Sequence, residues 1–429
     1  MTIALLGFGI EGKSAYAYLS RQYAGASFVV YDEKSQQPLD LPEGIGFHGN
    51  LKDFHGIQAD LVIRTPSVAP ARVSATGEIT SVTKLFFDAC PAQIIGVTGT
   101  KGKGTTASLI ASILKAAGKT VHLVGNIGLA ALDVLPDITT EDIVVYELSS
   151  YQLWDLEKSP QTAVVLMIEP DHLDVHANFD QYVLAKANIA KHQQATDRTI
   201  FYANNEYSCQ IAATSSGSRE AYPLETGLHV SDGYFVDGAR QICEITALKL
   251  PGSFNLDNAL AAIAAVRPWT EDGTVIATGL SAFTGLPHRL KFVAEKRGVR
   301  YYDDSIATTP GSALAAAGAF KQPKVLILGG ISKGANFDQM AVELKGYELR
   351  SILLLGEEAG NIEQSLQRAG MTHYERLPEK ITMAQIVTRA SELAQPGDVV
   401  LLSPACSSLD MFKGYQDRGD QFITAVNSL

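Results

Sequence analysis

Short apolar runs alternate with amphipathic stretches along most of the 429-residue chain. The first runs are residues 3–6, 28–31 and 61–64, and residues 14–21 have the spacing of a helix. Short apolar runs that alternate with helical patterns are typical of buried strands in parallel sheets. The beginning of the chain is therefore predicted to fold as an α/β unit.

The same alternation continues in two later groups of apolar runs. The strands predicted there are residues 94–97, 143–146, 163–168, 324–328, 351–355 and 399–402. A glycine-rich segment after the first of these strands leads into a helix predicted over residues 105–117. Residues 199–250 show a weaker pattern that indicates smaller strands.

The length of the chain exceeds what one ordinary core accommodates, since domains usually hold about 100–200 residues. Breaks near residues 88–91 and 285–287 favour three domains: residues 1–91, 92–286 and 287–429. We predict an α/β fold with a Rossmann-like N-terminal domain, a central ATPase domain of the P-loop type and a Rossmann-like C-terminal domain.

Composition and charge narrow the class of protein. With 46% hydrophobic and 19% charged residues the chain resembles soluble globular proteins. A net charge of -11 argues against broad binding to nucleic acid or to an anionic membrane. The four cysteines form no CxxC pair, and the N-terminus lacks a basic region followed by a long apolar run. A cytoplasmic protein, neither exported nor membrane-anchored, is expected.

The most informative segment is the glycine-rich loop of residues 96–106, Gly-Val-Thr-Gly-Thr-Lys-Gly-Lys-Gly-Thr-Thr. It lies between a predicted strand and a predicted helix, where backbone N–H groups and a helix N-terminus hold phosphates. The residues predicted to bind ATP here are Gly99, Thr100, Lys101, Gly102, Lys103, Gly104, Thr105 and Thr106. A plain glycine turn is the alternative, but it does not explain the lysine after such dense glycines.

Two positions of this loop depart from the usual P-loop pattern. Lys103 would neutralise the transferred phosphate, and a Walker-type loop places a Ser or Thr directly after that lysine to hold Mg²⁺. This chain has Gly104 there, so the hydroxyl of Thr105 is the predicted metal contact.

A second glycine motif, Gly7-Phe8-Gly9-Ile10-Glu11-Gly12, follows the first predicted strand. Asp32 ends the next strand 20 residues after Gly12, which matches the spacing of a dinucleotide fingerprint. An NAD-dependent oxidoreductase is therefore an alternative, although it leaves residues 96–106 unexplained. Preferential binding of UDP or of NADH would separate the two interpretations.

Together these motifs resemble the Mur ligases and the related folylpolyglutamate synthases, over nearly the whole chain. The shared segments are the loop at 96–106, Gly125-Asn126-Ile127-Gly128, Glu147-Leu148-Ser149-Ser150, Pro170-Asp171-His172-Leu173-Asp174, His288-Arg289 and Ser403-Pro404-Ala405-Cys406. The Glu-Leu-Ser-Ser and Ser-Pro-Ala-Cys segments are similar to the branch of the family that adds D-glutamate.

The resemblance implies a metal and catalytic group. Thr105 and Glu147 would hold the Mg²⁺ bound to ATP, and His172 would contact a second Mg²⁺. Lys186 would be carbamylated and would extend toward the metal, so that Lys103, His172 and Lys186 form the catalytic set. Without the resemblance, His172 is a capping or core histidine and Lys186 a solvated helix lysine.

The resemblance also implies the substrate contacts. Gly7, Gly9, Gly12 and Asp32 would hold the diphosphate and nucleoside of a UDP-sugar, together with Asn126 and Ser149. Asn258 would contact adenine, while Arg289 and Asp304 would contact the phosphates or ribose of ATP. His288, Thr308, Lys333, Ser408 and Tyr415 would surround the remaining substrate, with Lys333 and Thr308 on the carboxylates of glutamate.

Four residues differ from the family pattern: Glu11 in the first glycine turn, Lys101 in the ATP loop, Phe254 and Ile306. The implied activity is that of an ATP-dependent amide ligase that joins D-glutamate to UDP-N-acetylmuramoyl-L-alanine through an acyl phosphate, as a monomer with two Mg²⁺ ions. A folate polyglutamylating ligase remains an alternative, because Lys103-Gly104-Thr105 is similar to its Lys-Gly-Ser. A nucleotide-gated binding protein is a third interpretation.

Overall fold

The computed structural model describes residues 1–172, 175–332 and 334–429. The described chain divides into two compact units. The first unit comprises Met1–Leu248 and Leu256–Phe283, and the second comprises Lys249–Asn255 and Thr284–Leu429. The finer division into three domains, with boundaries after residues 91 and 286, stays a prediction.

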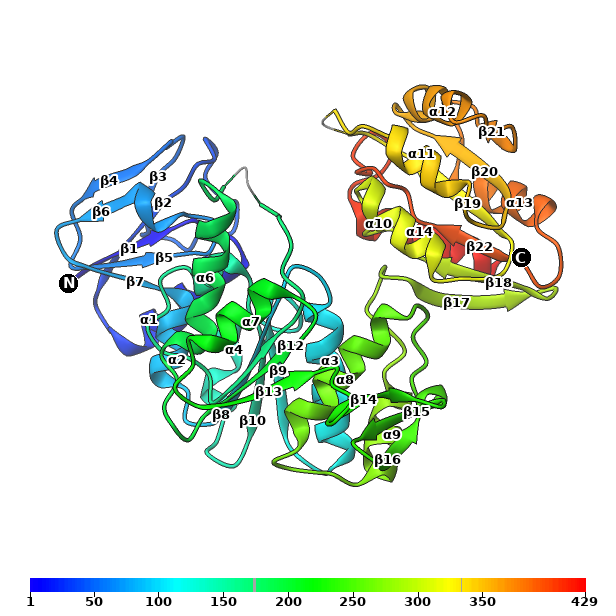
Figure 1. Cartoon of the computed structure of the whole chain (residues 1–429). Coiled ribbons are helices and arrows are strands. Elements are labelled where there is room, and N and C mark those ends of the chain that lie inside the picture. Colours follow the sequence, from blue (N-terminus) through cyan, green and yellow to red (C-terminus); the bar gives the residue numbers. More distant parts are fainter. Residues whose placement is uncertain (173–174, 333) are drawn as a thin grey trace. The chain divides into compact units, whose positions relative to one another are not determined.

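The chain begins with a parallel five-stranded sheet of order β3-β2-β1-β5-β7 (Figure 1). Its strands are β1 (Thr2–Leu6), β2 (Ser27–Tyr31), β3 (Gly46–His48), β5 (Leu61–Arg64) and β7 (Glu78–Ser81). Helix α1 (Ile10–Gln22) connects β1 to β2. The strand order reverses between β1 and β5, and ligands of open α/β sheets bind where such a reversal occurs. The strands predicted in this region are confirmed.

Smaller elements complete this part of the chain. They are β4 (Phe54–Ile57) paired with β6 (Val73–Ala75), the 3-10 turn η1 (Pro70–Arg72) and α2 (Val82–Ala89).

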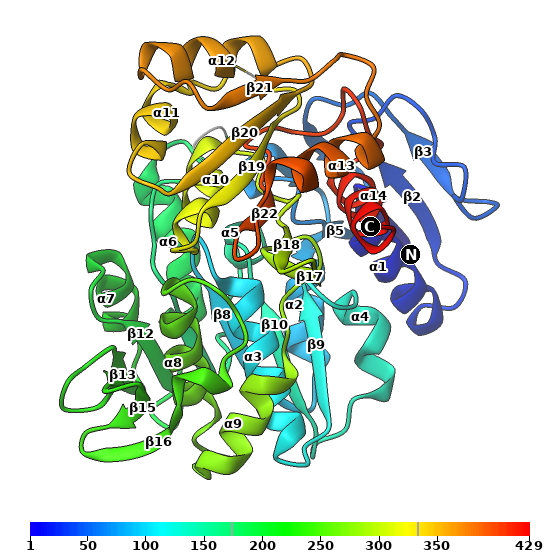
Figure 2. The same cartoon turned by 90° about the vertical axis from the view of Figure 1, so that its right-hand side faces the viewer.

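A second parallel sheet follows, with six strands in the order β13-β12-β11-β8-β10-β9. The strands are β8 (Gln93–Thr98), β9 (Val121–Gly125), β10 (Ile143–Glu147), β11 (Thr162–Val165), β12 (Arg198–Tyr202) and β13 (Ser218–Tyr222). Helix α3 (Lys103–Ala116) packs on β8, β9 and β10, and α9 (Gly273–Ala282) packs on α3 (Figure 2). The central strand β8 thus has β10 and β11 as its neighbours.

The remaining elements of the first unit connect or flank this sheet. They are α4 (Ala131–Val134), η2 (Leu135–Asp137), α5 (Ser150–Leu153), α6 (Phe179–Lys191), α7 (Glu206–Ala213), η3 (Ile245–Ala247), most of α8 (Phe254–Val266), and the antiparallel strands β14 (Leu228–Ser231), β15 (Tyr234–Asp237) and β16 (Arg240–Glu244). The smaller strands expected over residues 199–250 are confirmed, whereas helix α7 was not predicted.

One predicted strand was too long. Strand β11 ends at Val165, whereas the apolar run continued to residue 168. Beyond Val165 the backbone bonds the loop that follows β8: the Leu166 N–H donates to Thr98 O (2.9 Å), and Met167 O accepts from the Thr100 N–H (2.9 Å). The backbone at this end of the apolar run therefore holds the loop that follows β8.

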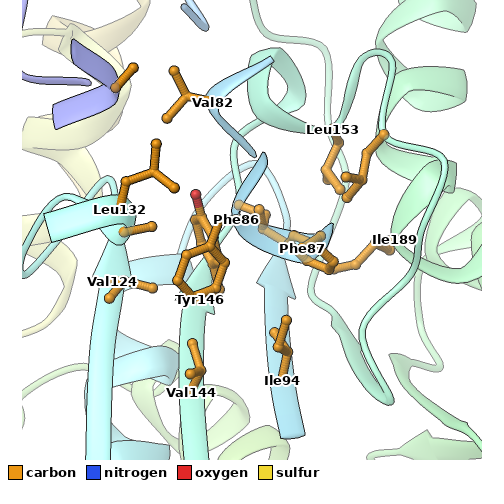
Figure 3. Packing of buried hydrophobic residues seen from close by; sticks show 14 of the residues in the cluster. Val82, Phe86, Phe87, Ile94, Val124, Leu132, Val144, Tyr146, Leu153 and Ile189 are labelled. Carbon is orange, nitrogen blue, oxygen red and sulfur yellow. The ribbon is translucent and has the colours of Figure 1, made fainter. Parts of the chain in front are cut away.

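A single hydrophobic cluster extends from the first sheet into the second. Figure 3 shows Phe86 and Phe87 of α2 beside Tyr146 of β10, and the ring centroids lie 5.4 and 5.8 Å from that of Tyr146. Tyr146 is buried. Helix α2 therefore joins the two sheets of the first unit through aromatic packing.

The second unit contains one six-stranded sheet of order β17-β18-β22-β19-β20-β21. Its strands are β17 (Lys291–Lys296), β18 (Val299–Asp303), β19 (Lys324–Gly329), β20 (Leu349–Leu355), β21 (Tyr374–Arg376) and β22 (Val399–Leu402), and β17 pairs antiparallel with β18. The predicted strands of this region are confirmed.

Helices cover both faces of this sheet. Helices α10 (Pro310–Gly318), α11 (Asp338–Leu344) and α12 (Ala359–Arg368) contribute to one hydrophobic cluster, and α13 (Met383–Leu393) and α14 (Tyr415–Asn427) to another. In β19 the side chains of Leu326 and Leu328 join the first cluster, whereas Val325 and Ile327 join the second. A strand that alternates between two apolar layers is buried on both sides.

Across the described ranges, no helix has both the length and the apolar character that a membrane span requires.

Arg64, at the end of β5, is a buried cation that ties this strand to the segment around α5. Its guanidinium donates to the Asp155 carboxylate and to the carbonyl oxygens of Thr65, Val68 and Tyr151. The side chain is 1% exposed, so these partners replace water for all five N–H groups.

Replacing Arg64 by Met is expected to lower the free energy of unfolding by about 3–5 kcal/mol, because the partly buried Asp155 carboxylate and the carbonyl groups lose the hydrogen bonds that Arg64 donates. Urea unfolding measures this loss. Arg72→Met is the control: Arg72 pairs with Glu33 and Asp53 in exposed positions, where ion pairs contribute below about 1 kcal/mol. Equal losses in both variants would contradict the assignment.

Candidate functional site

The loop between β8 and α3 has the backbone geometry of an anion-binding turn. Gly102 has φ +84° and precedes the first residue of α3, so the N-terminus of a 14-residue helix opens toward the loop. A Cβ atom on Gly102 would lie 2.4 Å from Asn258 Oδ1, so a side chain there would have to displace Asn258. Helix α3 begins at Lys103, two residues before the start of the helix predicted over 105–117, and ends at Ala116.

Two lysines converge beneath this loop. Lys103 Nζ donates to Gly99 O (3.1 Å) and Thr100 O (3.0 Å). Lys186 Nζ, from α6, donates to the same Gly99 O (2.9 Å) and to Thr98 Oγ1 (3.3 Å). Burial, and then the charge of Lys103, hold the pKa of Lys186 well below its usual value. The solvated helix lysine is thereby excluded as an interpretation of Lys186.

Glu147 ends β10 and pairs in register with Val97 of β8, so its carboxylate lies at the edge that carries the loop. It is buried. Gly125 of β9 pairs with Glu147, and the following Asn126 N–H points to Glu147 O at 3.5 Å. Ser149 caps α5 by accepting a hydrogen bond from the Gln152 N–H. The structure thus groups Asn126, Glu147 and Ser149 at this edge.

His172 follows β11 with φ +53° and a half-exposed ring. Its ring centroid lies 5.1 Å from that of Tyr151 and 6.4 Å from that of Tyr182. Tyr182 also lies under Lys186 Nζ, 4.6 Å from the ring centroid, and its hydroxyl is 3.0 Å from Thr100 Oγ1. Tyr182 therefore links His172, Lys186 and the loop.

Sequence reasoning missed Tyr182, although a signal was present. It lies four residues before Lys186 in the same helix, and residues at that spacing share one helix face. Of the other loop residues, Lys101 forms an exposed ion pair with Glu169 (3.7 Å), and Thr106 Oγ1 donates to Asn258 Oδ1 (3.2 Å). Thr105 is buried at the start of α3.

The first glycine turn is also tightly built. Gly7 has φ +87°, and a Cβ atom on Gly12 would lie 2.2 Å from Gly7 O. Gly9 is the N-cap of α1. The Asp32 carboxylate, directly after β2, accepts from the Phe8 N–H (3.1 Å), so Asp32 closes the turn. The predicted residues Gly7, Gly9, Gly12 and Asp32 therefore lie together.

The second unit holds its own cluster of predicted residues. Asp304 accepts from Ser403 Oγ (2.7 Å) and from the Leu290 N–H (3.0 Å), and burial raises its pKa to about 7. His288 Nδ1 lies 2.7 Å from the carboxylate of Asp303, which the sequence interpretation had not selected. Arg289 is exposed beside them.

The loops after β18 and β22 in this unit are joined by Arg418 of α14. Its guanidinium donates to Ser305 O (2.8 Å) and Cys406 O (3.0 Å). Ser408 is buried in the second of these loops, Tyr415 O accepts from Ser305 Oγ (2.8 Å), and Thr308 is exposed. Lys333 lies outside the described residues.

Among the described side chains, no group of three or more His, Cys, Asp or Glu residues is close enough to hold a metal ion. A Mg²⁺ ion, however, usually keeps several waters and takes one or two carboxylates together with substrate phosphates. Glu147 provides a buried carboxylate, and Thr105 and Thr106 provide hydroxyl groups in the first turn of α3. Oxygen ligands of these kinds suit Mg²⁺.

The chain matches two protein-family models, the Mur ligase middle domain over residues 97–266 and the Mur ligase glutamate ligase domain over residues 288–406. It is 36% identical to the UDP-N-acetylmuramoylalanine–D-glutamate ligase of Acetivibrio thermocellus, over 100% of this chain and 96% of that protein. The enzyme of the same name from Clostridium kluyveri is 34% identical, with the same shares covered.

Solved structures share the fold. The UDP-N-acetylmuramate-alanine ligase MurC of Thermotoga maritima aligns with a TM-score of 0.62 at 20% identity, over 100% of this chain and 99% of that one. The E. coli FolC in complex with DHPP and ADP aligns with a TM-score of 0.58 at 19% identity, over 81% of this chain and 91% of that one.

Gly102→Ala is expected to weaken ATP binding by at least about tenfold, because the new Cβ displaces Asn258 and strains the loop. Gly118→Ala is the matched control, since Gly118 has φ +75° but open space around it. It carries the same kind of backbone strain and should leave ATP affinity unchanged. Titration with a fluorescent ATP analogue measures both, and unchanged affinity in Gly102→Ala would contradict the assignment.

Proposed function

The chain belongs to the Mur ligase family, and on that premise we propose that it joins D-glutamate to UDP-N-acetylmuramoyl-L-alanine, with conversion of ATP to ADP and phosphate. It is an ATP-dependent ligase of peptidoglycan precursor synthesis. The observation that carries the proposal is the convergence of Lys103, Lys186 and Glu147 on one phosphate loop, in a chain that matches D-glutamate ligases over its whole length.

The reaction has two steps. A carboxylate oxygen of UDP-N-acetylmuramoyl-L-alanine attacks the γ-phosphorus of ATP, the bond to the β–γ bridging oxygen breaks, and an acyl phosphate and ADP result. The uncharged amine of D-glutamate then attacks the acyl carbon, phosphate leaves with the bonding electrons, and the nitrogen loses a proton. Both steps gather anions, and the N-terminus of α3 and the Lys103 ammonium offset that charge.

Thr105 and Glu147 are proposed to hold Mg²⁺ with ATP, and His172 a second Mg²⁺. The metal supplies charge neutralisation on the phosphate oxygens. Lys186 is proposed to carry a carbamate, which forms when an uncharged amine attacks CO₂ and releases a proton. Its lowered pKa favours the uncharged amine. The carbamate would turn a buried amine into an anionic oxygen ligand.

The second unit supplies the residues proposed for glutamate: Thr308, Lys333, Ser408 and the backbone near Tyr415. Asp304 and Arg289 are proposed to contact ATP, and Asn258 of the first unit the adenine. The three-domain division, the monomeric state and the cytoplasmic location are further parts of this proposal.

The oxidoreductase, the folate ligase and the binding protein are each less well supported, for different reasons. The dinucleotide fingerprint of residues 7–12 is explained by a turn that holds the diphosphate of a UDP-sugar, so NAD is not required. The likeness to FolC, at 19% identity, extends to the fold alone. A binding protein without turnover needs neither the buried Lys186 nor Glu147 at the loop edge.

The test is phosphate release from ATP with UDP-N-acetylmuramoyl-L-alanine and a panel of amino acids. D-glutamate is expected to stimulate release, and L-glutamate and D-aspartate are not. Lys103→Ala should lower the D-glutamate-dependent rate at least about a hundredfold, because one charge-stabilising group is lost. Binding of the UDP-substrate should be unchanged.

Lys119→Ala, which removes an exposed lysine just beyond α3, is the control and should retain the rate. Stimulation by another amino acid, or by none, would refute the proposed function. Equal loss of turnover and of UDP-substrate binding in Lys103→Ala would refute the placement of the site.

The carbamate predicts a separate spectroscopic result. Protein equilibrated with ¹³C-bicarbonate should show one carbamate carbon resonance that Lys186→Met removes. Lys191→Met, at the exposed end of the same helix, should retain it. A resonance that persists in Lys186→Met, or none in the parent protein, would contradict carbamylation of Lys186.

A further inference from the structure

Glu11 is the residue of the first glycine turn that the family pattern does not explain. It is the second residue of α1, directly before Gly12, where the turn is proposed to hold a diphosphate. A carboxylate repels a diphosphate, so an ionised Glu11 would weaken binding of the ligand proposed for this turn.

The Glu11 carboxyl connects the turn to the element that follows β10. Its Oε1 accepts from Gln152 Nε2 at 2.9 Å. The other end of the Gln152 amide is engaged too, since its Oε1 accepts from the Ser149 N–H (2.9 Å) and hydroxyl (3.0 Å). Gln152 is therefore fixed in orientation, and it presents a donor to Glu11.

The surroundings of Glu11 do not provide a cation for an ionised carboxylate. Glu11 Oε2 is buried and has no hydrogen-bond partner among the described residues. The cation whose charge acts on Glu11, Arg64 of β5, already directs all five N–H groups to Asp155 and to backbone carbonyls. Burial accordingly raises the pKa of Glu11 to about 7, although Gln152 and Arg64 oppose the change.

Two further groups that face this region are Tyr146 of β10 and Asp133 of α4. Tyr146 of β10 is a buried phenol whose pKa is raised, first by burial and then by the charge of Glu11. On the α4 side, Ser14 of α1 donates to the Asp133 carboxylate at 2.6 Å, so that acid is engaged with its own partner. Neither residue supplies a positive charge to the Glu11 carboxyl.

We propose that Glu11 is a positioning residue. Through Gln152, its neutral carboxyl holds the glycine turn of residues 7–12 against the capping box of α5. The UDP-sugar substrate binds the form of the protein in which this carboxyl is protonated. The inference rests on the proposed function, because it takes that substrate as the ligand of the turn. Gln152 thereby connects the proposed diphosphate turn to Ser149, which lies two residues after Glu147 in the sequence.

The sign of the pH dependence follows from the raised pKa. Below about pH 7 the carboxyl is neutral, and above it the fraction of binding-competent protein falls about tenfold per pH unit. The same shift makes folding stability decrease as pH rises from 4.5 toward about 7. A glutamine at position 11 keeps the shape and the contact with Gln152 but cannot ionise.

The experiment is calorimetric titration of the full chain with UDP-N-acetylmuramoyl-L-alanine at about pH 6 and about pH 8.5, for the parent protein, Glu11→Gln and Glu78→Gln. The parent should lose about thirtyfold in affinity between the two pH values. Glu11→Gln should change by less than about twofold. Glu78→Gln removes an exposed carboxylate from β7 of the first sheet and should behave as the parent.

Two further readouts accompany the titration: ATP affinity separates an effect on the UDP-substrate from a general structural defect, and thermal unfolding tests the protonation of Glu11. The ATP affinity of all three proteins should show the same pH dependence, because Glu11 acts on the UDP-substrate. The thermal unfolding midpoint of Glu11→Gln should exceed that of the parent above about pH 7 and match it near pH 4.5.

Glu11→Gln with the same loss of UDP-substrate affinity as the parent would overturn the inference and leave the proposed function standing. A parent protein whose affinity does not change with pH would overturn it as well. No binding of the UDP-substrate at either pH would refute the proposed function and the inference together.

Discussion

The carboxyl ends of β8, β10 and β11 meet at one edge of a parallel sheet, and the phosphate chemistry proposed for the first unit depends on that constraint. Loop 99–102 leaves β8 there, Glu147 ends β10 there, and the segment after β11 bonds the loop through Leu166 and Met167. Because β8 is hydrogen-bonded to both β10 and β11, residues that are up to about seventy positions apart in the sequence lie side by side at this edge.

That edge concentrates charge of both signs under restricted solvation. Lys103 and Lys186 share Gly99 O, and burial, followed by repulsion from Lys103, lowers the pKa of Lys186. An arriving nucleotide brings several negative charges, which the loop N–H groups and Lys103 would compensate. The buried amine of Lys186 is thus suited to chemistry that a solvated lysine does not undergo.

The first unit joins two sheets through apolar, ionic and polar contacts. Phe86, Phe87 and Tyr146 form the apolar part of this connection, and Arg64 with Asp155 forms the ionic part. Glu11 and Gln152 add a polar contact between the two glycine-bearing regions. A UDP-substrate held at the first turn would therefore influence the residues after β10 through direct hydrogen bonds.

The sequence by itself determined the α/β class, the strands at the apolar runs and the two glycine turns, because these depend on local periodicity and on backbone conformations that glycine adopts readily. It also identified Lys103 and Glu147 as candidates, whereas Lys186 became one only through the resemblance to a known family. Tertiary structure alone decided that Lys186 is buried beneath Gly99, that Tyr182 contacts Thr100, that β11 stops at Val165 and that Glu11 meets Gln152. Each of these depends on contacts between distant segments, which local sequence patterns do not encode.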